Sequence, residues 1–155
     1  MLLINKKVIY IFIALALIGT LGLSSCSSSG SSTTKATGDA AEIYGSMGGD
    51  KAVETIVSKT LDYASNDSRI SKYLTSTTKP LVKTVLTSEV CNAIGGPCEH
   101  SAISLKEAFK DTGFNAASGN ALMENIGKSM DDLKIPAKSK DDAMSSLASN
   151  LLKGL

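Results

Sequence analysis

The sequence predicts an all-α protein, in which one helical domain follows a targeting signal and a flexible tether. Apolar side chains recur at helical spacing through most of residues 39–155, and no segment shows strict alternation over the length of a strand. Glycine pairs and single prolines separate the helical stretches. The first 38 residues instead pass from an apolar run to a run of small polar residues. Residues 39–155 are enough for one hydrophobic core and hardly for two.

Residues 1–25 are predicted to be a lipoprotein signal peptide. Lys6 and Lys7 precede an apolar run at 8–23 that is short for a transmembrane helix, which needs about 20 apolar residues. The run ends in Leu-Ser-Ser-Cys, which resembles the bacterial lipobox, so cleavage and lipidation are expected at Cys26. An uncleaved signal anchor with an incidental cysteine is the alternative.

The mature chain is expected to be anchored by lipid to a membrane of the bacterial cell envelope. Acyl chains on Cys26 supply more than the two lipid signals that stable anchoring requires. Ser27 stands where an aspartate favours inner-membrane retention, so the expected address is the outer membrane, facing the periplasm, if the source has two membranes. Residues 26–38 are almost free of apolar side chains and are predicted to be a flexible linker spanning about 20 Å.

The first half of the domain contains three predicted helices. A short amphipathic helix at 39–44 precedes Gly45. A longer helix follows the Gly48-Gly49 break, with Asp50 as its predicted N-cap. The next begins near Pro80 and ends at Gly95-Gly96-Pro97. The predicted core faces of the two longer helices are Val53, Ile56, Val57, Leu61 and Ala64, then Leu81, Val82, Val85, Leu86, Val90, Ala93 and Ile94.

The second half begins with a long connection, residues 98–115, that holds only a short helix. This helix is predicted to start at Ser104, with Glu107 completing a capping box. Two longer helices follow, one stopped by Pro136 and one begun at Ser139. Their predicted core faces are Leu122, Ile126, Met130 and Leu133, then Met144, Leu147 and Leu151.

Composition excludes two classes of function. The formal net charge is +1 and the lysines are scattered, so no basic stripe points to nucleic acid. A hydrolase is not supported, because there is no serine elbow and the single histidine, His100, has no acid at a recognisable spacing. We therefore predict a protein that is not an enzyme.

Four segments together resemble the group 1 truncated haemoglobins, which are globins with a two-over-two helical fold. The segments are "IYGSMGGDKAVETIV", "NDSRISKYL", "VCNAIGGPCE" and "LKEAFKDTGF", and they keep their spacing across residues 44–114. The glycines at 48, 49, 95, 96 and 113 match the glycine motifs of that family, where helices end in backbone angles that a side chain would penalise. The resemblance implies a truncated globin-like fold for residues 39–155.

The same resemblance implies that the usual haem-binding side chains are missing. The proximal histidine, which binds iron in globins, falls on Phe109, whose ring has no lone pair to donate. The distal tyrosine falls on Leu61, preceded by Thr60 in place of an aromatic residue. The two positions that face bound ligand fall on Val82 and Leu86. These replacements predict a pocket filled by its own side chains.

Other ligands for haem iron stay open. His100 falls on a family tyrosine beside the second glycine turn, and reaching iron would require its loop to refold. Met123 or Met130 could act as axial thioethers, although methionine at helical spacing is more often core. The sequence has no Cys-x-x-Cys-His motif for covalent haem.

Cys91 and Cys98 lie seven residues apart across the second glycine turn. On one straight helix their Cα atoms would be about 10 Å apart, beyond the limit of about 7 Å for a disulfide. A turn at the glycines brings them closer, so the sequence is compatible both with a structural disulfide and with two free thiols. A redox-active pair and a zinc site with His100 and Glu99 are less well supported, because the sequence lacks a Cys-x-x-Cys motif and a full ligand set.

Two functional hypotheses remain. The first is a haem-free, globin-shaped lipoprotein that binds an unknown protein or small molecule at a membrane, with no cofactor. The second is a truncated haemoglobin that holds haem b through non-standard ligation and handles oxygen or nitric oxide. The joint replacements at Leu61, Val82, Leu86 and Phe109 favour the first.

Overall fold

The computed structural model describes residues 39–155, and these form an all-helical domain. Its elements are α2 (Asp39–Ser46), α3 (Asp50–Asn66), the 3-10 helix η1 (Ser71–Tyr73), α4 (Thr78–Ala93), α5 (Leu105–Ala108), α6 (Ala116–Asp132) and α7 (Ala137–Leu151). The described residues include no strand. The predicted signal peptide, the lipidation site Cys26 and the linker at 26–38 lie outside the described residues.

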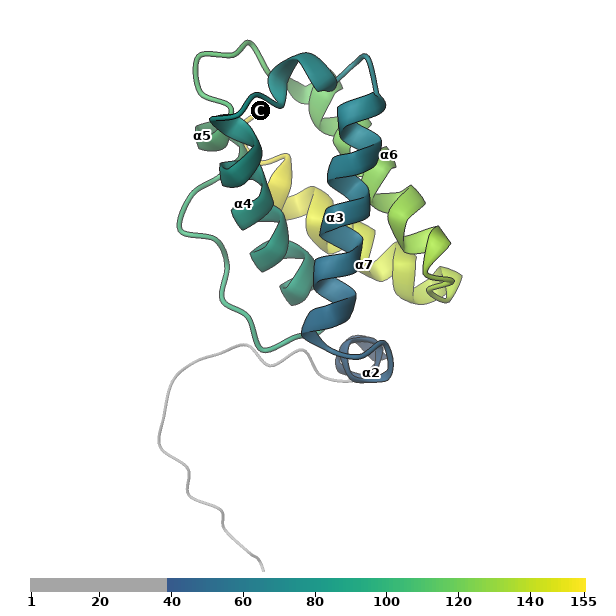
Figure 1. Cartoon of the computed structure of the whole chain (residues 1–155). Coiled ribbons are helices and arrows are strands. Elements are labelled where there is room, and N and C mark those ends of the chain that lie inside the picture. Colours follow the sequence, from purple (N-terminus) through teal and green to yellow (C-terminus); the bar gives the residue numbers. More distant parts are fainter. Residues whose placement is uncertain (1–38) are drawn as a thin grey trace, which may run out of the picture. The chain divides into compact units, whose positions relative to one another are not determined.

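Four long helices form the domain as two packed pairs. Helices α3 and α4 pack against each other, as do α6 and α7, and the pairs meet through contacts of α3 with α6 and of α4 with α7 (Figure 1). This is the two-over-two arrangement that the sequence predicts. Within residues 39–155, no helix is long and apolar enough to span a bilayer.

Glycines set the ends of two long helices, as predicted. Gly48 and Gly49 connect α2 to α3 with φ of 95° and 65°, and Gly95 follows α4 with φ of 85°. These values lie in the left-handed region, which glycine adopts without the steric penalty of a side chain. The amide of Gly96 donates to the carbonyl of Cys91 at 2.8 Å and caps the end of α4.

Two predicted helix starts are wrong. Asp50 is the first residue of α3 and Gly49 is its N-cap. Helix α7 begins at Ala137 and not at Ser139, because Pro136 is its N-cap: the Pro136 carbonyl already accepts a hydrogen bond from the Lys140 amide at 2.9 Å, so the first helical turn forms before Ser139. The capping box of Ser104 and Glu107 at α5 is confirmed.

The core lies between the two helix pairs and includes most of the predicted apolar faces. Of the predicted faces, Leu81 is exposed over 39 % of its surface, and Leu133 and Met144 are only partly buried. The largest fully buried side chains come from all four long helices, from α5 and from two connections: Ile56, Ile70, Leu86, Ile94, Leu105, Leu122, Ile126, Met130 and Leu147. Every buried polar side-chain atom of the described residues has a hydrogen-bond partner.

An ion-pair cluster joins the end of α3 to α6. Asp67 accepts hydrogen bonds from Arg69 Nε at 3.0 Å and Nη2 at 2.8 Å, and from Asn125 Nδ2 at 3.0 Å. Arg69 also donates to Glu124 at 2.7 Å. Arg69, through side-chain and backbone hydrogen bonds, and then Asn125 hold the pKa of Asp67 far below its usual 3.8.

This cluster predicts a loss of stability in acid. The pKa of Asp67 is lower in the folded than in the unfolded chain, so its stabilisation is complete above its usual pKa and disappears as the pH falls through the folded value. We expect the urea midpoint of unfolding to fall between about pH 5 and pH 2, and to fall less steeply in Asp67→Asn. Equal slopes in the two proteins would contradict this assignment.

Candidate functional site

The candidate site is the position at which the resemblance puts the iron-binding histidine. Phe109 occupies it as the C-cap residue of α5, with 3 % of its surface exposed. Its ring stacks on Phe114 with centroids 4.0 Å apart and an interplanar angle of 10°. Tyr73 meets both rings edge-on, at 6.3 Å from Phe109 and 5.4 Å from Phe114. We call Tyr73, Phe109 and Phe114 the aromatic cluster.

The positions that the resemblance assigns to the distal side of a haem pocket are also part of the core. Val82 and Leu86 have no exposed surface, and Leu61 has 5 %. Thr60 is fully buried, and its hydroxyl hydrogen-bonds the hydroxyl of Ser129 on α6 at 2.8 Å. An open haem pocket would leave these side chains in contact with solvent, whereas here protein atoms cover them.

His100 lies at the surface and not among these residues. Its side chain is 62 % exposed, and Nδ1 lies 2.9 Å from Oε2 of Glu89. The Glu89 side chain is only 8 % exposed, and its other oxygen accepts a hydrogen bond from the amide of Ser101 at 3.1 Å. A Glu89 carboxylate that accepts from Nδ1 leaves Nε2 with the lone pair, which is how a partner carboxylate orients a ligating histidine.

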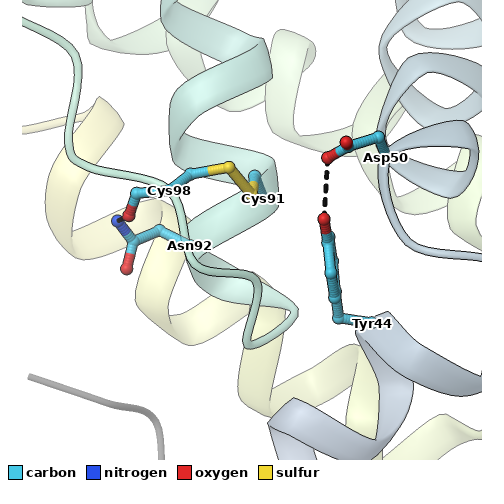
Figure 2. Close-up of a disulfide and its surroundings, with 5 residues drawn as sticks. All are labelled: Tyr44, Asp50, Cys91, Asn92 and Cys98. Atoms are coloured by element: carbon cyan, nitrogen blue, oxygen red, sulfur yellow. Dashed lines mark hydrogen bonds between the residues drawn. A yellow bond between two sulfur atoms is a disulfide. The ribbon is translucent and has the colours of Figure 1, made fainter.

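The structure joins Cys91 and Cys98 in a disulfide, with their Cα atoms 5.9 Å apart. Asn92 donates from Nδ2 to the carbonyl of Cys98 at 2.6 Å and reinforces the link (Figure 2). The turn at the glycines therefore brings the two cysteines together. Cysteines in a disulfide cannot serve as the thiolates that a zinc site requires.

The second glycine turn packs tightly against α2. A Cβ on Gly96 would lie 2.5 Å from Cys91 Sγ and 2.8 Å from the ring of Tyr44. The Tyr44 hydroxyl donates to Asp50 at 2.7 Å, as Figure 2 shows, and this hydrogen bond is the main reason that the pKa of Tyr44 is raised. The Tyr44 amide donates to the carbonyl of Ile94 at 3.2 Å.

The residues at the candidate site do not fit haem. Phe109 offers no electron pair to iron, and its ring is buried against the ring of Phe114. Met123 and Met130 are buried core residues, 7 % and 0 % exposed. Among residues 39–155 no group of three or more histidine, cysteine, aspartate or glutamate side chains has the arrangement of a metal site.

A separate groove of about 470 Å³ lies between α6 and α7. Its walls combine methionine and aliphatic side chains with a few polar ones, and include none of Leu61, Val82, Leu86 and Phe109. The lining residues are Asn120, Met123, Asp141, Met144, Ser145, Ala148 and Leu152.

Sequence reasoning did not identify Glu89, Tyr73 or Phe114 as part of these arrangements. Glu89 could have been found, because it lies three residues after Leu86 on the apolar face of a predicted helix, where a charged residue requires a partner. No sequence pattern identifies Tyr73 and Phe114, since their contacts with Phe109 depend on how the helices pack.

Comparison with solved structures identifies the fold. The chain is similar to the truncated haemoglobin of Tetrahymena pyriformis in its Fe(III) form, with a TM-score of 0.58 and 19 % identity, over 71 % of this chain and 97 % of that one. A mutant of the same protein gives a TM-score of 0.59 at the same identity and coverage. No protein-family model matches the chain, and no curated protein matches it. The domain therefore has the truncated globin fold.

Proposed function

We propose that this chain is a membrane-anchored member of the group 1 truncated haemoglobins that has lost standard haem ligation and acts as a binding module. The observation that carries the proposal is Phe109, buried and stacked on Phe114 at 4.0 Å, where the resemblance puts the proximal histidine. Its partner is a protein or a small molecule, and the module is not an enzyme. Neither nucleic acid nor a cofactor enters the proposal.

Energetics support a core that closes without haem. Burying a valine, leucine or phenylalanine side chain contributes about 1.5–3 kcal/mol relative to leaving it exposed. Leu61, Val82, Leu86 and Phe109 each supply such burial. A space large enough for a porphyrin would instead add a cavity cost that grows with its volume.

An absorption titration with haemin tests the proposal. Residues 27–155 are titrated while the Soret band is followed, with circular dichroism as a check that the protein is helical. We expect no saturable, sharpened band at one equivalent. A sharp band that saturates at one haem per chain would contradict the proposal.

The second candidate function is a haem protein that handles oxygen or nitric oxide with His100 as its iron ligand. The observation that favours it is the contact of Nδ1 with Glu89, which leaves Nε2 for a metal. Against it stand the 62 % exposure of the side chain and the ties of its loop to α4. A Soret band that appears in the native chain and disappears in His100→Ala would favour this second function.

Restoring a histidine is expected not to restore haem binding. In Phe109→His the imidazole can ligate iron, but Leu61, Val82 and Leu86 still fill the space that a porphyrin needs. The haemin titration of Phe109→His should therefore resemble that of the native chain. A stoichiometric complex of this variant would mean that the pocket is open and that only the ligand is lacking.

The anchor is part of the proposal. A lipobox-like sequence ending at Cys26 favours lipidation there and an address in the bacterial envelope, the outer membrane facing the periplasm if the source has two membranes. In Cys26→Ala the acyl chains have no attachment site, so we expect the protein to lose incorporated palmitate. Metabolic labelling of Cys26→Ala and of Ser27→Ala, the matched control, checks this. Equal labelling of the two variants would contradict lipidation at Cys26.

A further inference from the structure

The connection between α4 and α5 is held to α4 at several points. The last two turns of α4 provide Glu89, Cys91 and Asn92, and all three hold residues of the segment 98–101. The ties are the disulfide Cys91–Cys98, the hydrogen bond from Asn92 to the carbonyl of Cys98 at 2.6 Å, and the two contacts of the Glu89 carboxylate with His100 and Ser101, at 2.9 and 3.1 Å.

These ties lie next to the element that carries Phe109. Only residues 102–104 separate Ser101 from α5, so the placement of Ser101 limits where α5 can begin. Helix α5 has four residues, and helices of this length do not form without support from their surroundings. Its support comes from the buried side chains of Leu105, Ala108 and Phe109 and from the tied segment before it.

We infer that the Cys91–Cys98 disulfide is a redox-sensitive latch, which keeps α5 and Phe109 closed over the core when oxidised and lets them open when reduced. The inference rests on the proposed function, because a latch of this kind matters only where the core closes without haem. It assigns a means of regulation to the aromatic cluster: in the open form Phe109 and Phe114 become accessible to an apolar ligand.

The redox step requires a dithiol reductant. One thiolate of the dithiol attacks Sγ of Cys98, which is half-buried, whereas Cys91 is fully buried. The disulfide bond breaks, and Cys91 leaves as a thiolate and takes up a proton. The second thiol of the reductant then attacks the mixed disulfide, Cys98 is released and protonated, and the reductant becomes its own disulfide. Two electrons and two protons pass to the protein.

Breaking the disulfide removes the covalent tie, so that the polar contacts between α4 and the segment are then the hydrogen bonds of Asn92 and Glu89. The bond from Asn92 ends on the carbonyl of Cys98 itself, so it depends on the position of that residue. The His100 side chain is largely exposed, where its contact with Glu89 competes with water. Opening is therefore expected to be confined to residues 98–114, while α3 and α6 keep their packing.

Hydrogen exchange of the full chain in detergent micelles tests the latch, with and without dithiothreitol. The reporters are the amides of Ala108, Phe109 and Thr112, which donate to Ser104, Leu105 and Phe109. We expect their exchange to rise by about tenfold or more on reduction, while amides of α3 and α6 change by less than about twofold. Cys91→Ala/Cys98→Ala should exchange like the reduced chain and should not respond to the reductant.

Two results would overturn the latch: no change in exchange at residues 104–114, or an equal rise throughout α3, α4 and α6, which is general destabilisation. If the double variant fails to fold, the exchange measured on the native chain with and without dithiothreitol still tests the latch. The haemin titration of oxidised residues 27–155 separates the two claims. A negative titration with unchanged exchange rejects the latch alone, whereas a stoichiometric complex rejects the proposed function and the latch with it.

Discussion

Replacing Phe109 by alanine is expected to lower the free energy of unfolding by about 3–5 kcal/mol, the range measured for truncation of buried aromatic side chains. The loss has two parts. The Phe109 side chain is only 3 % exposed, so the variant loses the free energy of burying the ring. The stacked Phe114 and the edge-on Tyr73 are also left facing a cavity. Urea unfolding followed by circular dichroism measures the change.

Lys110→Ala is the matched control for this prediction. Lys110 follows Phe109 directly in the chain and is exposed, so its truncation should change the free energy of unfolding by less than about 0.5 kcal/mol. A loss below about 1 kcal/mol in Phe109→Ala would mean that the phenylalanine is poorly packed. The site would then not be closed by its own side chains.

Gly96→Ala is expected to destabilise the domain by about 1–3 kcal/mol, the usual range for overpacking. The added methyl would lie 2.5 Å from Cys91 Sγ, which the disulfide holds in place, and 2.8 Å from the Tyr44 ring, which the hydrogen bond to Asp50 fixes. Neither neighbour is the free end of a flexible chain, so the turn itself has to move.

Gly45→Ala is the control for the glycine turn. A Cβ on Gly45 meets nothing within 4 Å, and Gly45 lies inside α2. Alanine is favoured over glycine in a helix by about 1 kcal/mol, so this variant should be neutral or more stable. If Gly96→Ala unfolds at the same urea concentration as Gly45→Ala, the close packing of α2 on the turn is not a source of stability.

Much of the fold could be predicted because its signals are local. Apolar periodicity depends only on neighbours three or four residues away, and the glycines at 48, 49 and 95 mark backbone angles that other residues resist. Pro136 shows the limit of such signals. The proline predicts that the preceding helix stops, but it does not say where the next one begins; α7 begins directly after it, at Ala137, with Pro136 as its N-cap.

The burial of the candidate-site residues could be predicted from the sequence, and the contacts among their rings could not. The resemblance aligns Leu61, Val82, Leu86 and Phe109 with the haem-facing positions of the family, and the structure buries all four. The contact of Phe109 with Tyr73 joins residues 36 positions apart, from η1 and α5. No local pattern encodes it, because tertiary packing decides which rings meet.

The second glycine turn shows why the sequence alone does not decide whether Cys91 and Cys98 form a disulfide. Spacing along a straight helix excludes the pairing of Cys91 and Cys98, whereas a turn at Gly95 and Gly96 permits it. The chain takes the turn, and the Cα atoms come to 5.9 Å. Asn92 hydrogen-bonds the carbonyl of Cys98, and Glu89 contacts His100 and the amide of Ser101. Sequence spacing does not identify these partners.

The most direct test of a core that closes without haem is urea unfolding of residues 27–155, measured with and without one equivalent of haemin. The account predicts one cooperative transition with the same midpoint in both, because a ligand stabilises a protein only if it binds the folded state. A midpoint that shifts to higher urea with haemin, or a haem-free chain that unfolds without cooperativity, would contradict it.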